Sequence, residues 1–209
     1  MVTNVYVDGF NLYFGALKGT DHKWLDLEKL FRFLLPNNTI KSIKYYTARV
    51  KQRAGDPDQP VRQAAYLRAL ETIPNLEIFY GHYRSYPKRL PTAKSVRKGK
   101  RIKFVEVIKT DEKGSDVNLA TQLLYDAFLK DFEVAVVVSN DSDLEEPVRI
   151  VHDELGFKLG IINPYKHPSK DLMKHADFFK RIRTGALANA QCPDSLTDAI
   201  GTFTKPPEW

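Results

Sequence analysis

The sequence has little of what secreted and membrane-embedded proteins need. Its 209 residues include a single cysteine, Cys192, which excludes an intramolecular disulfide, and no CxxC-like spacing indicates a zinc site. No apolar run reaches the ~18 residues of a membrane span, and the amino terminus lacks the charged-then-apolar order of a signal peptide. We therefore expect a cytoplasmic protein with no membrane contact, in which the Cys192 thiol has no role.

Motifs of two common α/β enzyme classes are also missing. A dinucleotide-binding enzyme needs GxGxxG after its first strand, but Gly9 is the only glycine in the segment Asp8-Gly9-Phe10-Asn11. A phosphatase of the haloacid dehalogenase type needs a second aspartate two residues after the first, and Phe10 occupies that position. Both classes are set aside.

The sequence does contain an alternation of strand-like and helical patterns. It is 43% hydrophobic, enough for one substantial core, and its length does not require two full domains. We expect strands over residues 2–7, 40–50, 76–80, 133–138 and 157–162, and helices over residues 25–35, 60–71, 115–129 and 144–154. This alternation predicts an α/β fold with a parallel sheet and right-handed crossovers. The segment after about residue 184 has no clear period and is expected to form an extended tail or a strap over the body.

Acidic residues occur where the predicted strands end. Asp8 follows the first strand, Asp141 and Asp143 follow a later apolar strand, and Asp116 lies at the start of a helix. In an open parallel sheet the functional crevice lies outside the carboxyl ends of the strands. Carboxylates that converge there raise one another's pKa unless a cation neutralises them, and hard oxygen ligands suit Mg²⁺ or Mn²⁺. Acids from three separate regions therefore predict a divalent-metal site.

Each of these residues also has a structural interpretation. An aspartate after a strand is a common helix N-cap, which is an equally good reading of Asp116 or Asp141 alone. Asp8 fits a simple turn. Asn11, three residues after Asp8, fits either a cap or an amide that holds a metal-bound water or a phosphate oxygen.

Three motifs occur in order along the chain: VDGFNL at residues 7–12, EKGSDV at residues 112–117 and VSNDSDL at residues 138–144. Together they resemble the motifs of the NYN domains, a branch of the PIN-like ribonucleases that includes the LabA-type proteins. The resemblance spans about residues 2 to 183. It gives an NYN domain over residues 1–183, with a C-terminal tail over 184–209. Many members have glycine at the positions of Asn140 and Ser142, and phenylalanine at that of Leu144.

The resemblance implies a PIN-like three-layer α/β fold with a central, mostly parallel sheet flanked by helices. It also implies an acidic pocket that holds Mg²⁺ or Mn²⁺ and hydrolyses RNA phosphodiester bonds. Position by position, the implied catalytic residues are Asp8, Asn11, Asp116, Asp141 and Asp143, and the four aspartates are also the implied metal ligands. One or two metal ions, endo- or exonucleolytic cleavage, and activity on DNA all stay open.

A different class of function is the main alternative: a non-cleaving RNA-binding or regulatory module on the same fold. The intact acids at positions 8, 116 and 141 argue against it, because binding alone does not need repelling carboxylates under the path of the phosphates.

One segment carries the positive charge of the chain. Residues 84–113 hold eleven lysines and arginines against three acids, a formal charge of +8, whereas the whole chain has +6 and the remainder therefore sums to −2. Pro87 and Pro91 interrupt the helix–strand alternation here. We expect an extended or hairpin-like excursion over about residues 83–112 that leaves the sheet after Tyr80.

This basic segment is the predicted RNA-binding surface, because lysine and arginine neutralise phosphates and release counterions. Aromatic residues interleaved with it are candidates for stacking on bases: Tyr80, His82, Tyr83, Tyr86 and Phe104. A solvated charge run is the alternative interpretation. Single-stranded RNA is the expected partner, and homo-oligomerisation is left open. The predicted RNA-binding residues are Arg97, Lys98, Lys100, Arg101, Lys103 and Lys113.

Overall fold

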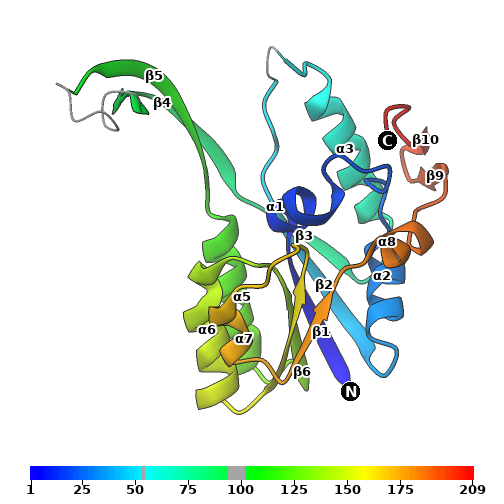
Figure 1. Cartoon of the computed structure of the whole chain (residues 1–209). Helices are drawn as coiled ribbons and strands as arrows, with labels where there is room; N and C mark the ends of the chain where they lie inside the picture. The colour runs from blue at the N-terminus through cyan, green and yellow to red at the C-terminus, as the bar shows by residue number, and fades with distance from the viewer. Residues whose placement is uncertain (53–54, 94–101) are drawn as a thin grey trace.

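The computed structural model describes residues 1–52, 55–93 and 102–209 (Figure 1). The strands are β1 Val2–Asp8, β2 Thr39–Thr47, β3 Leu76–Tyr80, β4 His82–Pro91, β5 Phe104–Lys113, β6 Val134–Val138, β7 Lys158–Asn163, β8 Phe178–Arg181, β9 Ser195–Asp198 and β10 Gly201–Thr204. The α-helices are α1 Gly9–Leu12, α2 Leu27–Leu34, α3 Gln59–Glu71, α5 Ser115–Phe128, α6 Glu145–Arg149, α7 Lys170–Lys174 and α8 Thr184–Asn189. Two π-helical segments, η1 and η3, and one 3-10 segment, η2, cover Tyr13–Leu17, Ile150–Glu154 and Ser142–Leu144.

Six parallel strands form the central sheet in the order β3-β2-β1-β6-β7-β8. The chain builds this sheet outward from β1 in both directions, so the order of strands reverses between β1 and β6. In open α/β sheets, ligand sites form at such a switch point. Helices α2, α3 and α8 cover one face and α5, α6 and α7 the other (Figure 1). This arrangement confirms the predicted three-layer α/β fold.

Alternation along β1 divides the core between the two faces. Val5 and Val7 pack in one hydrophobic cluster, while Tyr6 packs in the other. All three side chains are fully buried. The strand therefore delivers its last residue, Asp8, to the edge of a sheet that is covered on both sides.

The C-terminal segment lies against the body. The indole nitrogen of Trp24 donates to the carbonyl of Pro193 at 2.8 Å, and Arg68 donates to both carboxylate oxygens of Asp198 at 2.6 and 2.7 Å. Burial raises the pKa of the Cys192 thiol to about 12, so a reactive thiolate is not expected there at neutral pH. No helix among the described residues is long and apolar enough to cross a membrane.

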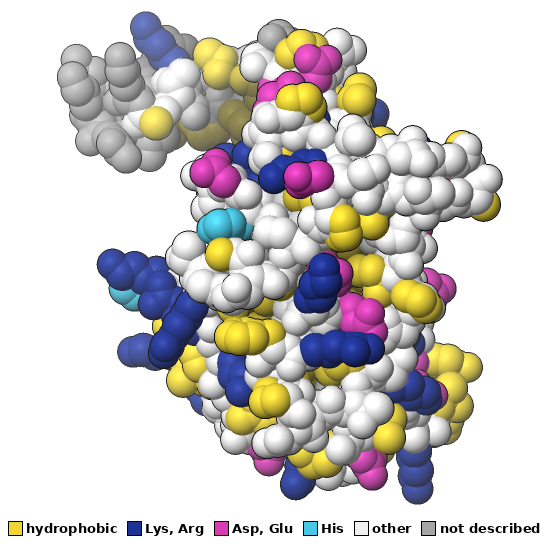
Figure 2. Space-filling view, turned by 90° about the vertical axis from the view of Figure 1, so that its right-hand side faces the viewer, with side chains coloured by type: hydrophobic (Ala, Val, Ile, Leu, Met, Phe, Trp, Pro, Cys, Tyr) yellow, Lys and Arg dark blue, Asp and Glu magenta, His cyan; other side chains and the backbone are white. Residues whose placement is uncertain are grey.

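Strands β4 and β5 form a separate antiparallel ribbon, which we call the basic ribbon, in the segment where the sequence predicts a hairpin-like excursion. The ribbon projects from the body between β3 and α5 (Figure 1). Seen from another side, it carries both hydrophobic and basic side chains on its surface (Figure 2). Four of the predicted RNA-binding residues lie outside the described residues: Arg97, Lys98, Lys100 and Arg101.

Candidate functional site

Asp8 is held at the end of β1 by three hydrogen bonds. Its Oδ1 accepts from the backbone amide of Asn11 at 2.9 Å, and its Oδ2 accepts from Asn11 Nδ2 at 2.6 Å and from Ser139 Oγ at 3.0 Å. The residue is 2% exposed. Burial raises the pKa of Asp8, the hydrogen bonds from Asn11 and Ser139 oppose that rise, and the charge of Asp141 adds to it. Asp8 is thus the N-cap of α1 and also a buried acid at the switch point.

The same two neighbours join the end of β1 to the loop after β6. The Asn11 Oδ1 accepts from the backbone amide of Asn140 at 3.1 Å, and the Ser139 hydroxyl accepts from the amide of Asp141 at 3.1 Å. Asn11 therefore uses both ends of its side-chain amide to hold the two loops together. The structure gives it a positioning role, and contact with a water or a phosphate stays a prediction.

Asp141 begins η2 and caps it. Its Oδ1 accepts from the amide of Asp143 at 3.0 Å, whereas its Oδ2 has no hydrogen-bond partner in the described ranges. The neighbouring Asn140 fixes the loop after β7, since it accepts from the amide of Ser169 at 2.6 Å and donates to the carbonyl of His167 at 3.1 Å. The Asn140 side chain thus holds the loop after β7 against the loop after β6.

Asp116 lies in the first turn of α5, behind Gly114, which takes the N-cap position with φ 101°. Burial raises the pKa of Asp116 to about 6, with further contributions from the charges of Asp8, Asp141, Glu112 and Asp143. The N-cap interpretation holds for Asp141 but not for Asp116, and Asp8, for which a simple turn was the structural interpretation, is itself an N-cap. The structure brings the four predicted aspartates into one electrostatic neighbourhood, which we call the acidic cluster.

Two residues of this neighbourhood were not predicted from the sequence. Glu112 accepts from the Ser115 hydroxyl at 2.7 Å and amide at 3.2 Å, so it fixes the start of α5 while its charge acts on Asp116. Tyr165 follows β7, and burial together with the charges of Asp8 and Asp141 raises its pKa. Its position just beyond a strand end is the signal that could have identified it.

The acidic cluster forms no ion pair within the described ranges, since none of its four aspartates pairs with Lys, Arg or His. Within the same ranges, no three His, Cys, Asp or Glu side chains are close enough to form a ready-made metal shell. Mg²⁺ commonly binds through one or two carboxylates and keeps several waters, so these hard oxygen donors fit it by their chemistry.

Of the predicted RNA-binding residues that are described, Lys103 and Lys113 are both exposed. They lie at opposite ends of the basic ribbon, with Lys113 next to the start of α5.

A model of the NYN domain family matches residues 2–183 of this sequence. The chain belongs to the NYN domain family. NYN domains are nuclease-like, and PIN-like nuclease domains usually use divalent metal ions, which agrees with the coarse prediction from the sequence motifs.

Two similar proteins frame this assignment. One relative is 6-hydroxy-3-succinoylpyridine 3-monooxygenase HspA of Pseudomonas putida (strain DSM 28022 / S16), which is 30% identical to this chain over 236 aligned residues. The alignment covers 99% of this chain and 75% of the relative. The crystal structure of a protein of unknown function, VPA0982 from Vibrio parahaemolyticus RIMD 2210633, matches with a TM-score of 0.58 and 16% identity, covering 91% of this chain and 96% of that one. The second match shows a shared fold.

The raised pKa of Asp116 gives a testable pH dependence. Because burial and neighbouring charges raise this pKa from 3.8 to about 6, the native carboxyl group binds its proton more tightly than the unfolded chain does. The contribution of Asp116 to the free energy of unfolding should therefore fall as pH rises from about 4 to about 6, so the wild-type free energy of unfolding minus that of Asp116→Asn should fall over this range. Urea unfolding in EDTA, followed by circular dichroism, measures both curves.

Asp21→Asn is the matched control, because Asp21 is exposed and lies outside the acidic cluster. It should retain the wild-type curve. Identical curves for wild type and Asp116→Asn at every pH would contradict the assignment of a perturbed Asp116.

Proposed function

We propose that this chain is a divalent-metal-dependent ribonuclease that hydrolyses phosphodiester bonds of single-stranded RNA. The observation that carries the proposal is the acidic cluster itself. Burial and the charges of neighbouring acids raise the pKa of Asp116 to about 6, and none of the four carboxylates forms an ion pair with a described residue. A fold does not gain stability from such an arrangement, so a bound cation is the simplest reason for it.

The acidic cluster would hold Mg²⁺ or Mn²⁺ through Asp8, Asp116, Asp141 and Asp143. Asp8 has three of its lone-pair sites occupied by hydrogen bonds, whereas Asp141 has one free oxygen and no described residue donates to the Asp116 or Asp143 carboxylates. Asp8 would therefore contribute at most one direct contact, through Oδ1, and the other three aspartates offer more open donors. A bound divalent ion supplies neutralisation of phosphate charge and activation of water.

The protein's own part in the reaction is to fix the acids and to position the strand. Asn11 and Ser139 lock Asp8 to the loop that carries Asp141. Hydrolysis would then form a bond from a water oxygen to phosphorus and break the bond to the leaving nucleotide oxygen, which takes up a proton. One side leaves as a phosphate monoester and the other as a hydroxyl.

The pairing register of the basic ribbon separates its charges by face. Directly opposite residues of an antiparallel pair lie on the same face. One face carries four basic residues and one acid, a formal charge of +3: Arg84, Lys88, Lys109, Lys113 and Asp111. The opposite face carries Arg89 with Glu106 and Glu112, a formal charge of −1. The first face supports the proposal of a surface that binds phosphates.

Cleavage is the first test. Purified protein should cut labelled single-stranded RNA with Mn²⁺ or Mg²⁺, and Asp8→Asn or Asp141→Asn should reduce the rate by roughly 100-fold while circular dichroism shows an unchanged fold. Asp21→Asn should cut like wild type. RNA binding without cleavage under any divalent ion would instead support the non-cleaving module.

RNA binding by the basic ribbon is tested by substitutions on its two faces. Arg84→Ala/Lys88→Ala should lower RNA affinity and reduce the salt slope by about 1.4, since each phosphate contact on a single strand contributes ~0.7. Arg89→Ala, on the other face, should leave the slope unchanged. Equal effects on both faces, measured by fluorescence anisotropy at several salt concentrations, would overturn the assignment of the face.

A second candidate is oxidation of a small hydroxypyridine, favoured by the 30% identity of the Pseudomonas relative over 99% of this chain. Such a monooxygenation consumes O₂ and a two-electron donor. Oxygen uptake with 6-hydroxy-3-succinoylpyridine and NADH is therefore the deciding measurement. We expect no substrate-dependent uptake from a protein that cuts RNA, and uptake without RNA cleavage would favour oxidation.

A further inference from the structure

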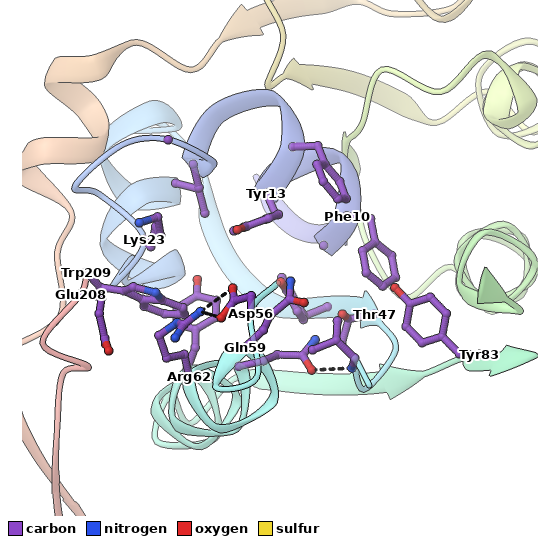
Figure 3. A pocket seen from close by; sticks show the side chains of 18 residues that line it. Phe10, Tyr13, Lys23, Thr47, Asp56, Gln59, Arg62, Tyr83, Glu208 and Trp209 are labelled. Carbon is purple, nitrogen blue, oxygen red and sulfur yellow. Dashed lines mark hydrogen bonds and ion pairs between the residues drawn. The ribbon is translucent and has the colours of Figure 1, made fainter. Parts of the chain in front are cut away.

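A cavity of about 370 Å³ lies between η1 and α3, close to the C-terminal residues (Figure 3). Its volume is in the range of small-molecule sites, roughly 300–1,000 Å³. Much of the wall is aromatic, and the rings come from segments far apart in the sequence. Those used below are Phe10, Tyr45, Tyr66, Tyr83 and Trp209.

The aromatic walls of the cavity are ordered by contacts with one another. Trp209 lies edge-on to Tyr66, with ring centroids 5.9 Å apart, and Phe10 lies edge-on to Tyr83 at 6.1 Å. Figure 3 shows Phe10 and Tyr83 together at one end and Trp209 at the other. Such walls favour a planar ring as the ligand.

Lys23 provides an available positive charge in this cavity. In the described part of the chain its ammonium group forms no ion pair and no hydrogen bond, although the residue is half-buried. Arg62, the other basic residue of the wall, is already neutralised by Asp56 through bonds of 2.5 and 2.6 Å. Among the described basic residues of the wall, Lys23 is therefore the one available to an anion, and the wall also holds the carboxylate of Glu208, whose charge acts on Arg62.

Tyr45 adds a hydroxyl group to the wall. Burial raises its pKa, so the group stays protonated, and it has no hydrogen-bond partner among the described residues. Gly9 makes this position accessible: a Cβ there would lie 2.6 Å from the Tyr45 ring and 2.7 Å from its hydroxyl. The close approach requires glycine next to Asp8.

The cavity and the acidic cluster are adjacent. Gly9 and Phe10 line the cavity and directly follow Asp8, whose charge contributes to the raised pKa of Tyr45. At the root of the basic ribbon, Tyr83 of the cavity pairs directly with Glu112, whose charge acts on Asp116; this pair lies on the ribbon face opposite Arg84 and Lys88. An RNA strand with one phosphate at the acidic cluster would thus have a neighbouring nucleotide at the cavity.

We propose that this cavity binds one nucleotide of the RNA strand, with its base between the aromatic walls and its phosphate at Lys23. The proposal rests on the proposed ribonuclease function and names a subsite for it. Every nucleobase has a planar face, so the aromatic walls alone would tolerate all four bases.

Binding can be tested without cleavage. The metal-free protein in EDTA is titrated with AMP, GMP, CMP and UMP by isothermal calorimetry, and with ribose 5-phosphate and nicotinate as partial ligands. Nucleotides should bind more tightly than either partial ligand. Lys23→Gln should weaken nucleotide binding about tenfold, since it removes a charge-assisted contact. Lys29→Ala is the matched control, because Lys29 pairs with Asp26 and does not line the cavity.

The possible outcomes distinguish failure of the subsite proposal from failure of the ribonuclease proposal. Nucleotide binding that depends on Lys23, in a protein that never cuts RNA, supports the subsite and overturns the ribonuclease. RNA cleavage with an unchanged KM in Lys23→Gln, and no nucleotide binding, overturns the subsite alone. Tight binding of nicotinate without binding of any nucleotide also overturns it, in favour of a free heteroaromatic acid.

Discussion

The buried carboxylate of Asp8 is the constraint on which the site depends. Burial disfavours its charge, and the hydrogen bonds from Asn11 and Ser139 only partly oppose that effect. The side chains of Asn11 and Ser139 also join α1 to the loop after β6. The residues that stabilise the charge of Asp8 therefore also hold the end of β1 close to that loop. An aspartate that served only as a helix cap would not need to be 2% exposed or to share its surroundings with other acids.

The strand order gives this residue its neighbours. With β1 and β6 side by side and the chain wound outward from both, Asp8 and Asp141 must end at the same edge, whatever the surrounding loops do. The basic ribbon enters at the same place because it is inserted between β3 and α5. Its last residues lead into α5, and Glu112 fixes that helix start. The ribbon is therefore part of the site at its root, and its register places the positive charge on one face.

Sequence reasoning identified the elements whose pattern is set by burial and missed those set by tertiary contact. The apolar runs of β1 and β6 are buried along almost their whole length, so the pattern alone locates them. The second strand was expected to reach residue 50 but ends at Thr47, where its pairing with β1 and β3 stops. The single helix expected over 144–154 is divided into η2, α6 and η3, and Pro147, which lacks a backbone N–H, lies within it. Strand β8 and the elements of the C-terminal segment have four to six residues, too few to show a period.

The acids of the site could be predicted because they stand at strand ends, whereas the cavity could not, because Lys23 and Trp209 meet only in the folded chain. That difference bears on the two proposed activities, RNA cleavage and oxidation of a small molecule. A 30% identical relative shares the fold, but activity depends on the site that the fold carries. Here the acidic cluster and the aromatic cavity are neighbours: Gly9 of the cavity follows Asp8, and Tyr83 of the cavity pairs with Glu112, whose charge acts on Asp116. A ring bound in the cavity would lie beside Asp8 during either reaction. Whether that ring is a nucleobase or a free small molecule therefore indicates the substrate of this protein more directly than overall sequence similarity does.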